Sequence, residues 1–260
     1  MEKAKRIASA CVLLMLIASC APQQNKSDLI IQSATMRDLG EAYLKQRDYT
    51  SALRKLLEAE AMNPEDPYLQ HDLGLAYMAK NSLENAENHI KKAIAIKPDF
   101  APAKNSLGVV YLTQEKWDAA IAVFKELTGD LLYATPHYPL THLGWAYYNK
   151  QQYETSEKYY REAIGYDANY APALRGLGRT CAAMGRTDEA IAFYEKAVAK
   201  SPRLVEAYFD LGRAYFRSGD YDKALAAFEK VRELAPEHAL AEEAEKEMLR
   251  IQMIQPGRAF

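Results

Sequence analysis

The feature that most constrains the fold of this chain is a Leu-Gly pair that returns at a nearly constant interval. The steps between successive pairs are 34, 34, 36, 34 and 34 residues. Self-similarity at a period of about 20–50 residues is the signature of a repeat architecture, in which each unit packs on its neighbours. The six pairs are Leu39-Gly40, Leu73-Gly74, Leu107-Gly108, Leu143-Gly144, Leu177-Gly178 and Leu211-Gly212.

Other residue types recur in register with the glycine. An aromatic residue or cysteine follows it first, then a small residue, then a large apolar one. Within each unit the apolar residues stand three and four apart in two runs, as two amphipathic helices require. The three sets are Tyr43, Tyr77, Tyr111, Tyr147, Cys181 and Tyr215; then Ala52, Ala86, Ala120, Ser156, Ala190 and Ala224; then Leu56, Ile90, Phe124, Tyr160, Tyr194 and Phe228.

This pattern resembles the tetratricopeptide repeat (TPR). The resemblance implies an all-α fold, a right-handed α-solenoid of six helix-turn-helix repeats. Residues 239–254 are predicted to form a capping helix with a polar outer face, and 255–260 a tail. The units are 33–66, 67–100, 101–134, 137–170, 171–204 and 205–238.

The repeated glycine needs a physical reason, because glycine inside a helix costs about 1 kcal/mol relative to alanine. We expect it to let the two helices of a unit approach closely, glycine facing the small residue of the second helix. Asp48, Ser82 and Asp220 are placed to cap the second helices of their units. Prolines are placed to end four of those helices. They are Pro64, Pro98, Pro202 and Pro236.

One connection departs from the pattern. Two residues are added between repeats 3 and 4, where the segment 128–139 contains Gly129, Pro136 and Pro139. Two interpretations remain open. The insertion is simply tolerated, or it divides the array into two lobes, residues 33–136 and 137–238.

The amino terminus has the pattern of a secretory signal in residues 1–19. A basic start precedes an apolar run that is too short for a membrane-spanning helix, which needs about 20 residues. The segment from Ile17 to Cys20 resembles a bacterial lipobox, which implies cleavage before Cys20 and lipidation there. Ala21 follows, which by the rule for such lipoproteins implies the periplasmic face of the outer membrane. The alternative is an ordinary secretory signal. Polar residues 20–32 are predicted to form a flexible tether.

The sequence offers little for catalysis. The five histidines have no zinc-helix spacing, and no nucleophile elbow or P-loop is present. Cys181 stands where other repeats have tyrosine, so it is interpreted as a core residue. The net charge of −2 does not favour nucleic-acid binding, which needs a basic field. We expect no enzyme activity, cofactor, metal or small-molecule substrate.

The resemblance implies a binding surface, because the first helices of TPR units line an inner groove. We expect an aromatic and aliphatic stretch at repeats 2–4 and a basic end at repeats 5–6, which would suit an extended or helical peptide with bulky apolar residues and acidic groups. The alternative is that Arg179 pairs with Asp210 and that Trp145 packs under the cap or the tether. The groove residues are His71, Leu75, Met78, Asn105, Val109, Leu112, Trp145, Tyr148, Asn149, Arg175, Arg179, Arg213, Phe216 and Arg217.

A lipoprotein made almost wholly of six such repeats resembles the type IV pilus pilotins, the pilus biogenesis and stability lipoproteins. This second resemblance rests on Cys20, the six-unit count and the Leu131-Leu132-Tyr133 corner. It implies that the chain helps the secretin, the outer-membrane pore subunit, to assemble. The competing interpretation is an adaptor lipoprotein for cell-wall hydrolases, envelope assembly or polysaccharide export.

Overall fold

In the computed structural model of the protein, residues 25–129 and 135–254 are described. The predicted signal peptide, Cys20 and residues 131–133 lie outside them. The described part contains thirteen helices and no strand, so the all-α prediction is confirmed. The chain divides into two compact units, an N-terminal unit (Met1–Ile96) and a C-terminal unit (Lys97–Phe260).

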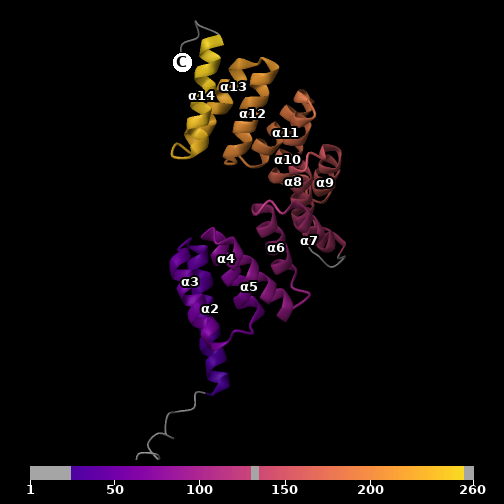
Figure 1. Ribbon diagram of the computed structural model, residues 1–260. Helices are drawn as coiled ribbons and strands as arrows, with labels where there is room; N and C mark the ends of the chain where they lie inside the picture. The colour runs from indigo at the N-terminus through magenta and orange to yellow at the C-terminus, as the bar shows by residue number, and fades with distance from the viewer. Residues whose placement is uncertain (1–24, 130–134, 255–260) are drawn as a thin grey trace, which may run out of the picture. The chain divides into compact units, whose positions relative to one another are not determined.

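Each unit is built from antiparallel helix pairs, one pair per repeat (Figure 1). The N-terminal unit holds α2 (Lys26–Lys45) with α3 (Tyr49–Met62), and α4 (Pro67–Ala79) with α5 (Leu83–Ile96). The C-terminal unit holds α6 (Ala101–Thr113), α7 (Trp117–Gly129), α8 (His137–Asn149), α9 (Tyr153–Tyr166), α10 (Ala171–Ala183), α11 (Thr187–Lys200), α12 (Val205–Ser218), α13 (Tyr221–Leu234) and α14 (Ala239–Ile254).

Helix α14 occupies the range that was expected for the cap. It packs on α13 through Ala241, Ala244, Met248 and Ile251, which are buried. Leu249 of the same helix is 54% exposed.

The repeated glycine makes room mainly for the large apolar side chain of the second helix. A carbon added at Gly40 would lie 2.6 Å from Leu56 Cγ, and one at Gly212 would lie 2.7 Å from the Phe228 ring. The expected approach to the small residue is present as well at Gly40, where the Ala52 carbonyl oxygen is 3.4 Å away. The prediction of a close approach was therefore right, but its main partner is the large residue.

The turn between the two helices of a repeat has one conformation that the sequence did not reveal. In every repeat the residue seven places after the glycine has a left-handed backbone with φ between 57° and 82°. The following amide then donates to a carbonyl near the end of the first helix, as Asp48 N does to Tyr43 O at 3.0 Å. These residues are Arg47, Asn81, Glu115, Gln151, Gly185 and Gly219.

The predicted caps are present at two of three sites. Asp48 accepts from the backbone N of Ser51, and Asp220 accepts from the backbone N of Lys223. The Ser82 hydroxyl instead accepts from the Asn85 side chain at 3.0 Å.

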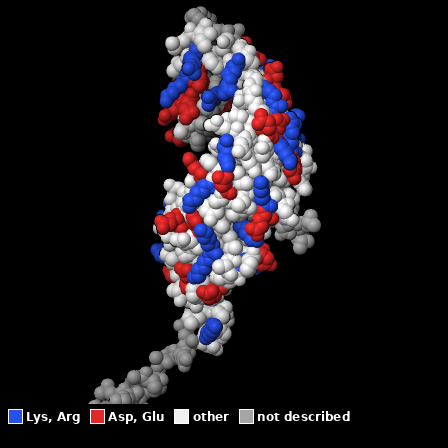
Figure 2. Space-filling view, turned by 45° about the vertical axis from the view of Figure 1, so that its right-hand side comes forward, with Lys and Arg blue, Asp and Glu red and all other residues white. Residues whose placement is uncertain are grey.

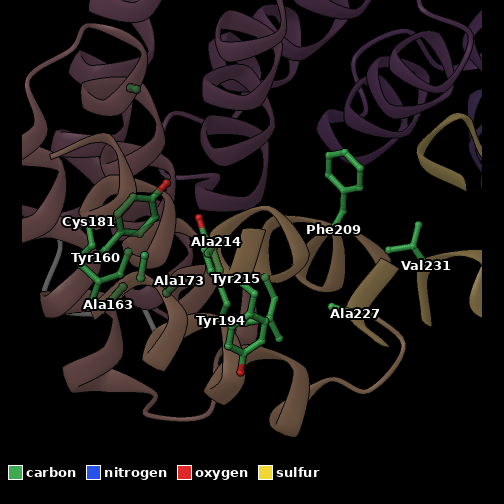
Figure 3. Packing of buried hydrophobic residues seen from close by; sticks show 14 of the residues in the cluster. Tyr160, Ala163, Ala173, Cys181, Tyr194, Phe209, Ala214, Tyr215, Ala227 and Val231 are labelled. Carbon is green, nitrogen blue, oxygen red and sulfur yellow. The ribbon is translucent and has the colours of Figure 1, made fainter. Parts of the chain in front are cut away.

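One apolar cluster runs through the C-terminal unit from Leu112 to Ile251, and Figure 3 shows part of it. It contains the large residue of the second helix of each of repeats 3 to 6, among them Tyr160 and Tyr194, and it also contains Cys181. Cys181 is fully buried, as its interpretation as a core residue requires.

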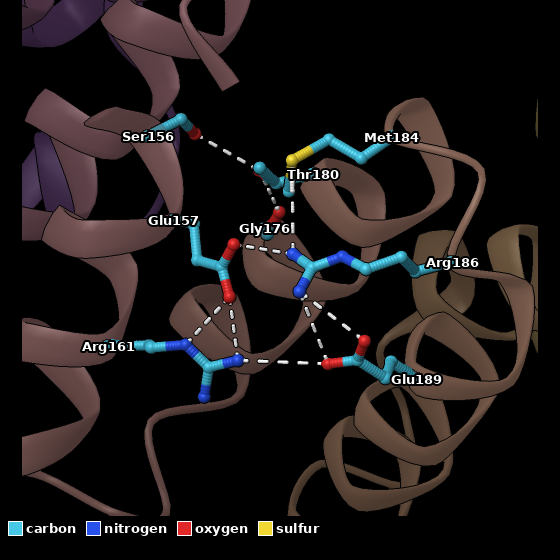
Figure 4. A network of polar contacts seen from close by, with 8 residues as sticks. All are labelled: Ser156, Glu157, Arg161, Gly176, Thr180, Met184, Arg186 and Glu189. Carbon is cyan, nitrogen blue, oxygen red and sulfur yellow. Dashed lines mark hydrogen bonds and ion pairs between the residues drawn. The ribbon is translucent and has the colours of Figure 1, made fainter. Parts of the chain in front are cut away.

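A polar network crosses from α9 to α10 and to the start of α11 beside this core (Figure 4). The Ser156 hydroxyl donates to the Gly144 carbonyl at 2.8 Å and lies 3.0 Å from the Thr180 hydroxyl. At the surface end, Glu157 pairs with Arg161 and Arg186, and Arg186 also pairs with Glu189. The two contacts of the Ser156 hydroxyl explain why serine can replace alanine in repeat 4, since a buried hydroxyl needs hydrogen-bond partners and this one has them.

One prediction on chain organisation was wrong, and one of the two open interpretations of the longer connection is not supported. Helix α2 begins at Lys26, so residues 26–32 belong to a helix rather than to a flexible tether; Asn25 caps it. The units divide after Ile96, not at the longer connection after repeat 3. Across that connection Phe124 stacks on His142 with ring centroids 4.9 Å apart, because both belong to the same apolar packing of α7 on α8.

A search of the described helices for one long and apolar enough to span a membrane found none.

Candidate protein-binding site

A pocket of about 280 Å³ opens among the first helices of repeats 4 and 5, within the C-terminal unit. Helix α8 contributes Thr141, His142 and Trp145 at helical spacing, so the three side chains lie near one face. Helix α10 contributes Arg175, Gly176 and Arg179 in the same way. The remaining wall is formed by Tyr160, Tyr170, Pro172 and Leu204.

Three of the predicted groove residues form one stack at this pocket. The rings of Trp145 and Tyr148 are nearly parallel, with centroids 5.9 Å apart and an angle of 8°. The guanidinium carbon of Arg179 lies 4.7 Å from the Trp145 centroid and 4.9 Å from the Tyr148 centroid. Such cation–π contacts hold a guanidinium plane in place. All three side chains are half-buried, so they are not sealed inside the packing.

The alternative pairing of Arg179 with Asp210 is wrong. Arg175 is the partner: its Nε donates to Asp210 Oδ2 at 2.6 Å, and both side chains are mostly shielded from solvent. Arg175 therefore ties α10 to α12 and has its charge matched, whereas Arg179 is left to the aromatic stack.

The histidine and the two tyrosines of the pocket wall are neutral at physiological pH. Burial lowers the pKa of His142 to about 4, so the imidazole is uncharged. Burial raises the pKa of Tyr170 to about 12, and it raises the pKa of Tyr160 further. Among the residues that line the pocket, the formal charges are those of Arg175 and Arg179.

The other predicted residues of α6 and α8 divide between surface and core. Asn105 and Val109 are half-buried, as is Asn149, whose Nδ2 donates to the Trp145 carbonyl at 2.8 Å. Leu112 is only 8% exposed and belongs to the core cluster. Its assignment to the groove was wrong, because packing against α7 and α8 takes up its side chain.

The basic end on α12 is exposed. Arg213 and Arg217 lie at the surface, and no carboxylate among the described residues pairs with either. Phe216 is half-buried. The centroids of the Phe216 and Tyr221 rings are 5.7 Å apart, and the guanidinium carbon of Arg250 in the capping helix lies 5.9 Å from the Phe216 centroid. Phe216 is thus partly taken up by α13 and α14.

The N-terminal unit contains His71, Leu75 and Met78, all half-buried on α4. Burial lowers the pKa of His71 to about 4. Beside it, burial together with the charge of Glu41 raises the pKa of Asp72 to about 7. The sequence did not point to Asp72, since nothing in one repeat's pattern indicates which carboxyl becomes buried.

Sequence reasoning also missed several residues of the pocket lining, among them His142, Tyr160 and Tyr170. Tyr160 stands at the repeated position of the large apolar residue in the second helix, which packs against the glycine of the first helix. No feature of the pattern indicates that the same ring also forms the wall of a pocket.

The comparisons with known proteins agree with this geometry. A tetratricopeptide repeat family model matches residues 37–101, 71–139 and 142–205, and a second tetratricopeptide repeat model matches 182–248. The chain belongs to the tetratricopeptide repeat family. A search of curated proteins found no match.

Solved structures of the same fold include two from type IV pilus work. The crystal structure of PilW, a widely conserved type IV pilus biogenesis factor, has a TM-score of 0.73 at 19% identity and covers 82% of this chain and 98% of its own. PilF of Pseudomonas aeruginosa has a TM-score of 0.68 at 17% identity, covering 83% and 97%. A tetratricopeptide repeat protein from Parabacteroides merdae has a TM-score of 0.69 at 17% identity, covering 92% and 88%. These similarities establish the fold.

Proposed function

We propose that this protein is a non-catalytic adaptor that is lipid-anchored at Cys20 on the periplasmic face of the outer membrane and holds a partner protein on the first helices of its repeats. The observation that carries the proposal is the stack of Trp145, Tyr148 and Arg179 at the pocket. Tryptophan, tyrosine and arginine dominate the energetics of protein interfaces.

The partner we propose is the secretin of a type IV pilus. Two observations support it: the lipobox at Cys20, and the similarity in fold to PilW and PilF along nearly their whole length. The alternative is that the chain is an adaptor for cell-wall hydrolases, envelope assembly or polysaccharide export. The co-purification described next distinguishes these partners from a secretin.

The test is co-purification from detergent-solubilised envelopes with the tagged full-length protein. The wild type should recover a secretin, and Trp145→Ala and Arg179→Glu should each lose it. Matched controls are Tyr166→Ala and Arg203→Glu, since Tyr166 is 62% exposed outside the pocket and Arg203 is likewise exposed. Equal recovery by all variants would remove the binding site from consideration. Recovery of hydrolases or export proteins instead of a secretin would replace the pilus assignment.

The anchor is tested separately. Cys20→Ser should release the protein from sedimented envelopes, and mass spectrometry of the wild type should find acyl chains on Cys20. Two or more chains are needed for stable anchoring. An unmodified Cys20 in the mature protein would contradict this part of the proposal.

A further inference from the structure

We infer that the pocket on α8 and α10 recognises an internal, extended segment of the partner in which an acidic side chain adjoins a bulky apolar one. The carboxylate would bind Arg179, and the apolar side chain would enter the pocket against Tyr160 and Tyr170. This inference rests on the proposed function, since it assumes that the surface binds a protein.

Arg179 is positioned to accept an anion. The guanidinium carbon lies over both the Trp145 and the Tyr148 ring, and the five N–H donors of an arginine lie in the plane of its guanidinium, pointing outward from the edge. No carboxylate among the described residues pairs with Arg179. Because the aromatic stack restricts the guanidinium before a ligand arrives, little side-chain entropy is lost on binding.

The surroundings favour an acid over a neutral or basic ligand. The charge of Arg175 is balanced by Asp210. His142, Tyr160 and Tyr170 are uncharged at neutral pH, because burial lowers the pKa of the histidine and raises the pKa of the tyrosines. One positive charge is therefore left without a counter-charge in the pocket wall. A carboxylate placed on it would form a charge-assisted hydrogen bond in a partly desolvated site.

The next repeat indicates that the ligand carries more than one acid. Helix α12 packs against α10, and it presents Arg213 and Arg217 at the surface without a carboxylate partner. Its acidic residues do not cancel them, because Asp210 is bound to Arg175 and Glu206 lies in the first turn of the helix, at its positive end. Several basic groups in succession suit acidic side chains spaced along a segment better than a single terminal carboxylate.

Tyr160 sets the apolar half of the site. Its ring lies between the backbones of Gly144 and Gly176, so its edge reaches the pocket while the ring stays fixed. Trp145, Leu204 and Tyr170 complete an apolar wall, and the pocket of about 280 Å³ is suited to one aliphatic or aromatic side chain.

The first experiment is a selection from a random peptide library displayed as an internal fusion, so that any carboxylate comes from a side chain. The wild-type protein should enrich peptides in which Asp or Glu adjoins Phe, Leu, Ile or Met, and Arg179→Gln should not. Enriched peptides that depend on Trp145 but carry no acid would overturn the inference and leave the proposed function standing. If no peptide is enriched and the co-purification recovers no partner, both this inference and the proposed function are overturned. Ligands found only with free carboxyl ends would overturn the assignment to a side chain.

The second experiment measures one enriched peptide and its Glu→Gln counterpart by titration calorimetry. For the wild type the amide peptide should bind about tenfold more weakly, the usual size for one charged hydrogen bond. With Arg179→Gln the two peptides should bind alike, whereas the control Arg203→Gln should keep the tenfold difference. The difference should also shrink with added salt. A tenfold difference that survives Arg179→Gln would overturn the role of Arg179.

Discussion

The ring of Tyr160 on α9 occupies the space that a side chain at residue 176 of α10 would fill. A carbon added at Gly176 would lie well inside 3.0 Å of the ring, and one added at Gly144 of α8 would lie 2.9 Å from it. Tyr160 is thus held between the first helices of two successive repeats, where it is 2% exposed. Gly176 is not the repeated glycine of its unit, so this contact belongs to the junction between repeats 4 and 5 and supports the pocket wall.

Gly176→Ala should therefore be destabilising. The added methyl group must displace Tyr160 or α10, and overpacking of this kind costs about 1–3 kcal/mol. Urea unfolding followed by tryptophan fluorescence measures it, since Trp117 and Trp145 both lie in the C-terminal unit. The control is Gly165→Ala in α9, where nothing lies within 4 Å of the added carbon; it should be neutral or stabilising by up to about 1 kcal/mol. Equal effects of the two substitutions would refute the steric account.

Arg179→Gln should leave the fold almost unchanged. The lost cation–π contact at a half-exposed site is worth about 0.5–1 kcal/mol, and no ion pair is broken. Urea unfolding should show this small change while partner recovery is lost. A loss of stability several times larger would mean that Arg179 serves the fold and not the site.

At the left-handed turn positions, introducing a glycine and removing one should have opposite effects on stability. Gln151→Gly should stabilise the protein by about 1 kcal/mol, because a non-glycine residue with φ of 58° pays a steric cost that glycine avoids. Gly185→Ala should destabilise the protein by a similar amount, because φ is 78° there. Nothing lies within 4 Å of the added carbon, so the effect would come from the backbone conformation and not from a steric clash. Thermal unfolding monitored by circular dichroism measures both. Glu154→Gly in the first turn of α9 is the control and should only destabilise; stabilisation by that variant too would discredit the explanation.

His142 should make the C-terminal unit sensitive to acid. Its folded pKa of about 4 lies below the ordinary value of 6.5, so between these values the unfolded chain binds a proton that the native state excludes. Stability is complete above pH 6.5 and is lost as the pH falls toward 4. His142→Phe keeps a ring against Phe124 and should be more stable than wild type by on the order of 1–2 kcal/mol at about pH 5, with little difference at about pH 7.5. Urea midpoints by tryptophan fluorescence test it; parallel pH profiles would contradict it.

Asp72 should act in the opposite direction in the N-terminal unit. Its pKa rises from 3.8 to about 7 through burial and the nearby charge of Glu41. The native state therefore holds a proton that the unfolded chain releases, and stability falls as the pH rises from about 4 to 7. Asp72→Asn should remove this loss and stabilise the protein by on the order of 1 kcal/mol at about pH 8, with little change at about pH 4. Circular dichroism in urea measures it, with exposed Asp99→Asn as control. A gain that is equal at both pH values would contradict the titration of Asp72.

The repeats could be predicted because each residue type meets a need that recurs in every unit. Gly40 and Leu56 face each other in repeat 1 for the same reason as Gly212 and Phe228 in repeat 6, so six copies of the pattern support one interpretation. The start of α2 at Lys26 could not be predicted in this way. Its first turns precede the first repeat, and no second copy exists for comparison.

The candidate site was only partly predictable. Trp145 and Arg179 stand at positions that face inward in every repeat, so their placement near one surface follows from the pattern. Which arginine pairs with Asp210 does not follow, because Arg175 and Arg179 are one turn apart on α10. Arg175 reaches Asp210 of α12, whereas Arg179 lies over Trp145 and Tyr148 of α8. A difference of one helical turn in three dimensions gave the carboxylate to Arg175.

By itself, the sequence determined that the chain forms paired helices in repeats, since a 34-residue period with small residues at fixed places admits few other structures. The tertiary structure alone decided that the chain divides after Ile96, that Leu112 is buried, and that Tyr160 supports a pocket beside Arg179, which pairs with no carboxylate of the described residues. The physical reason is that periodicity reports contacts within a unit and between equivalent units, which are local. Burial, pKa shifts and ion pairing depend on the particular side chains that successive repeats bring together.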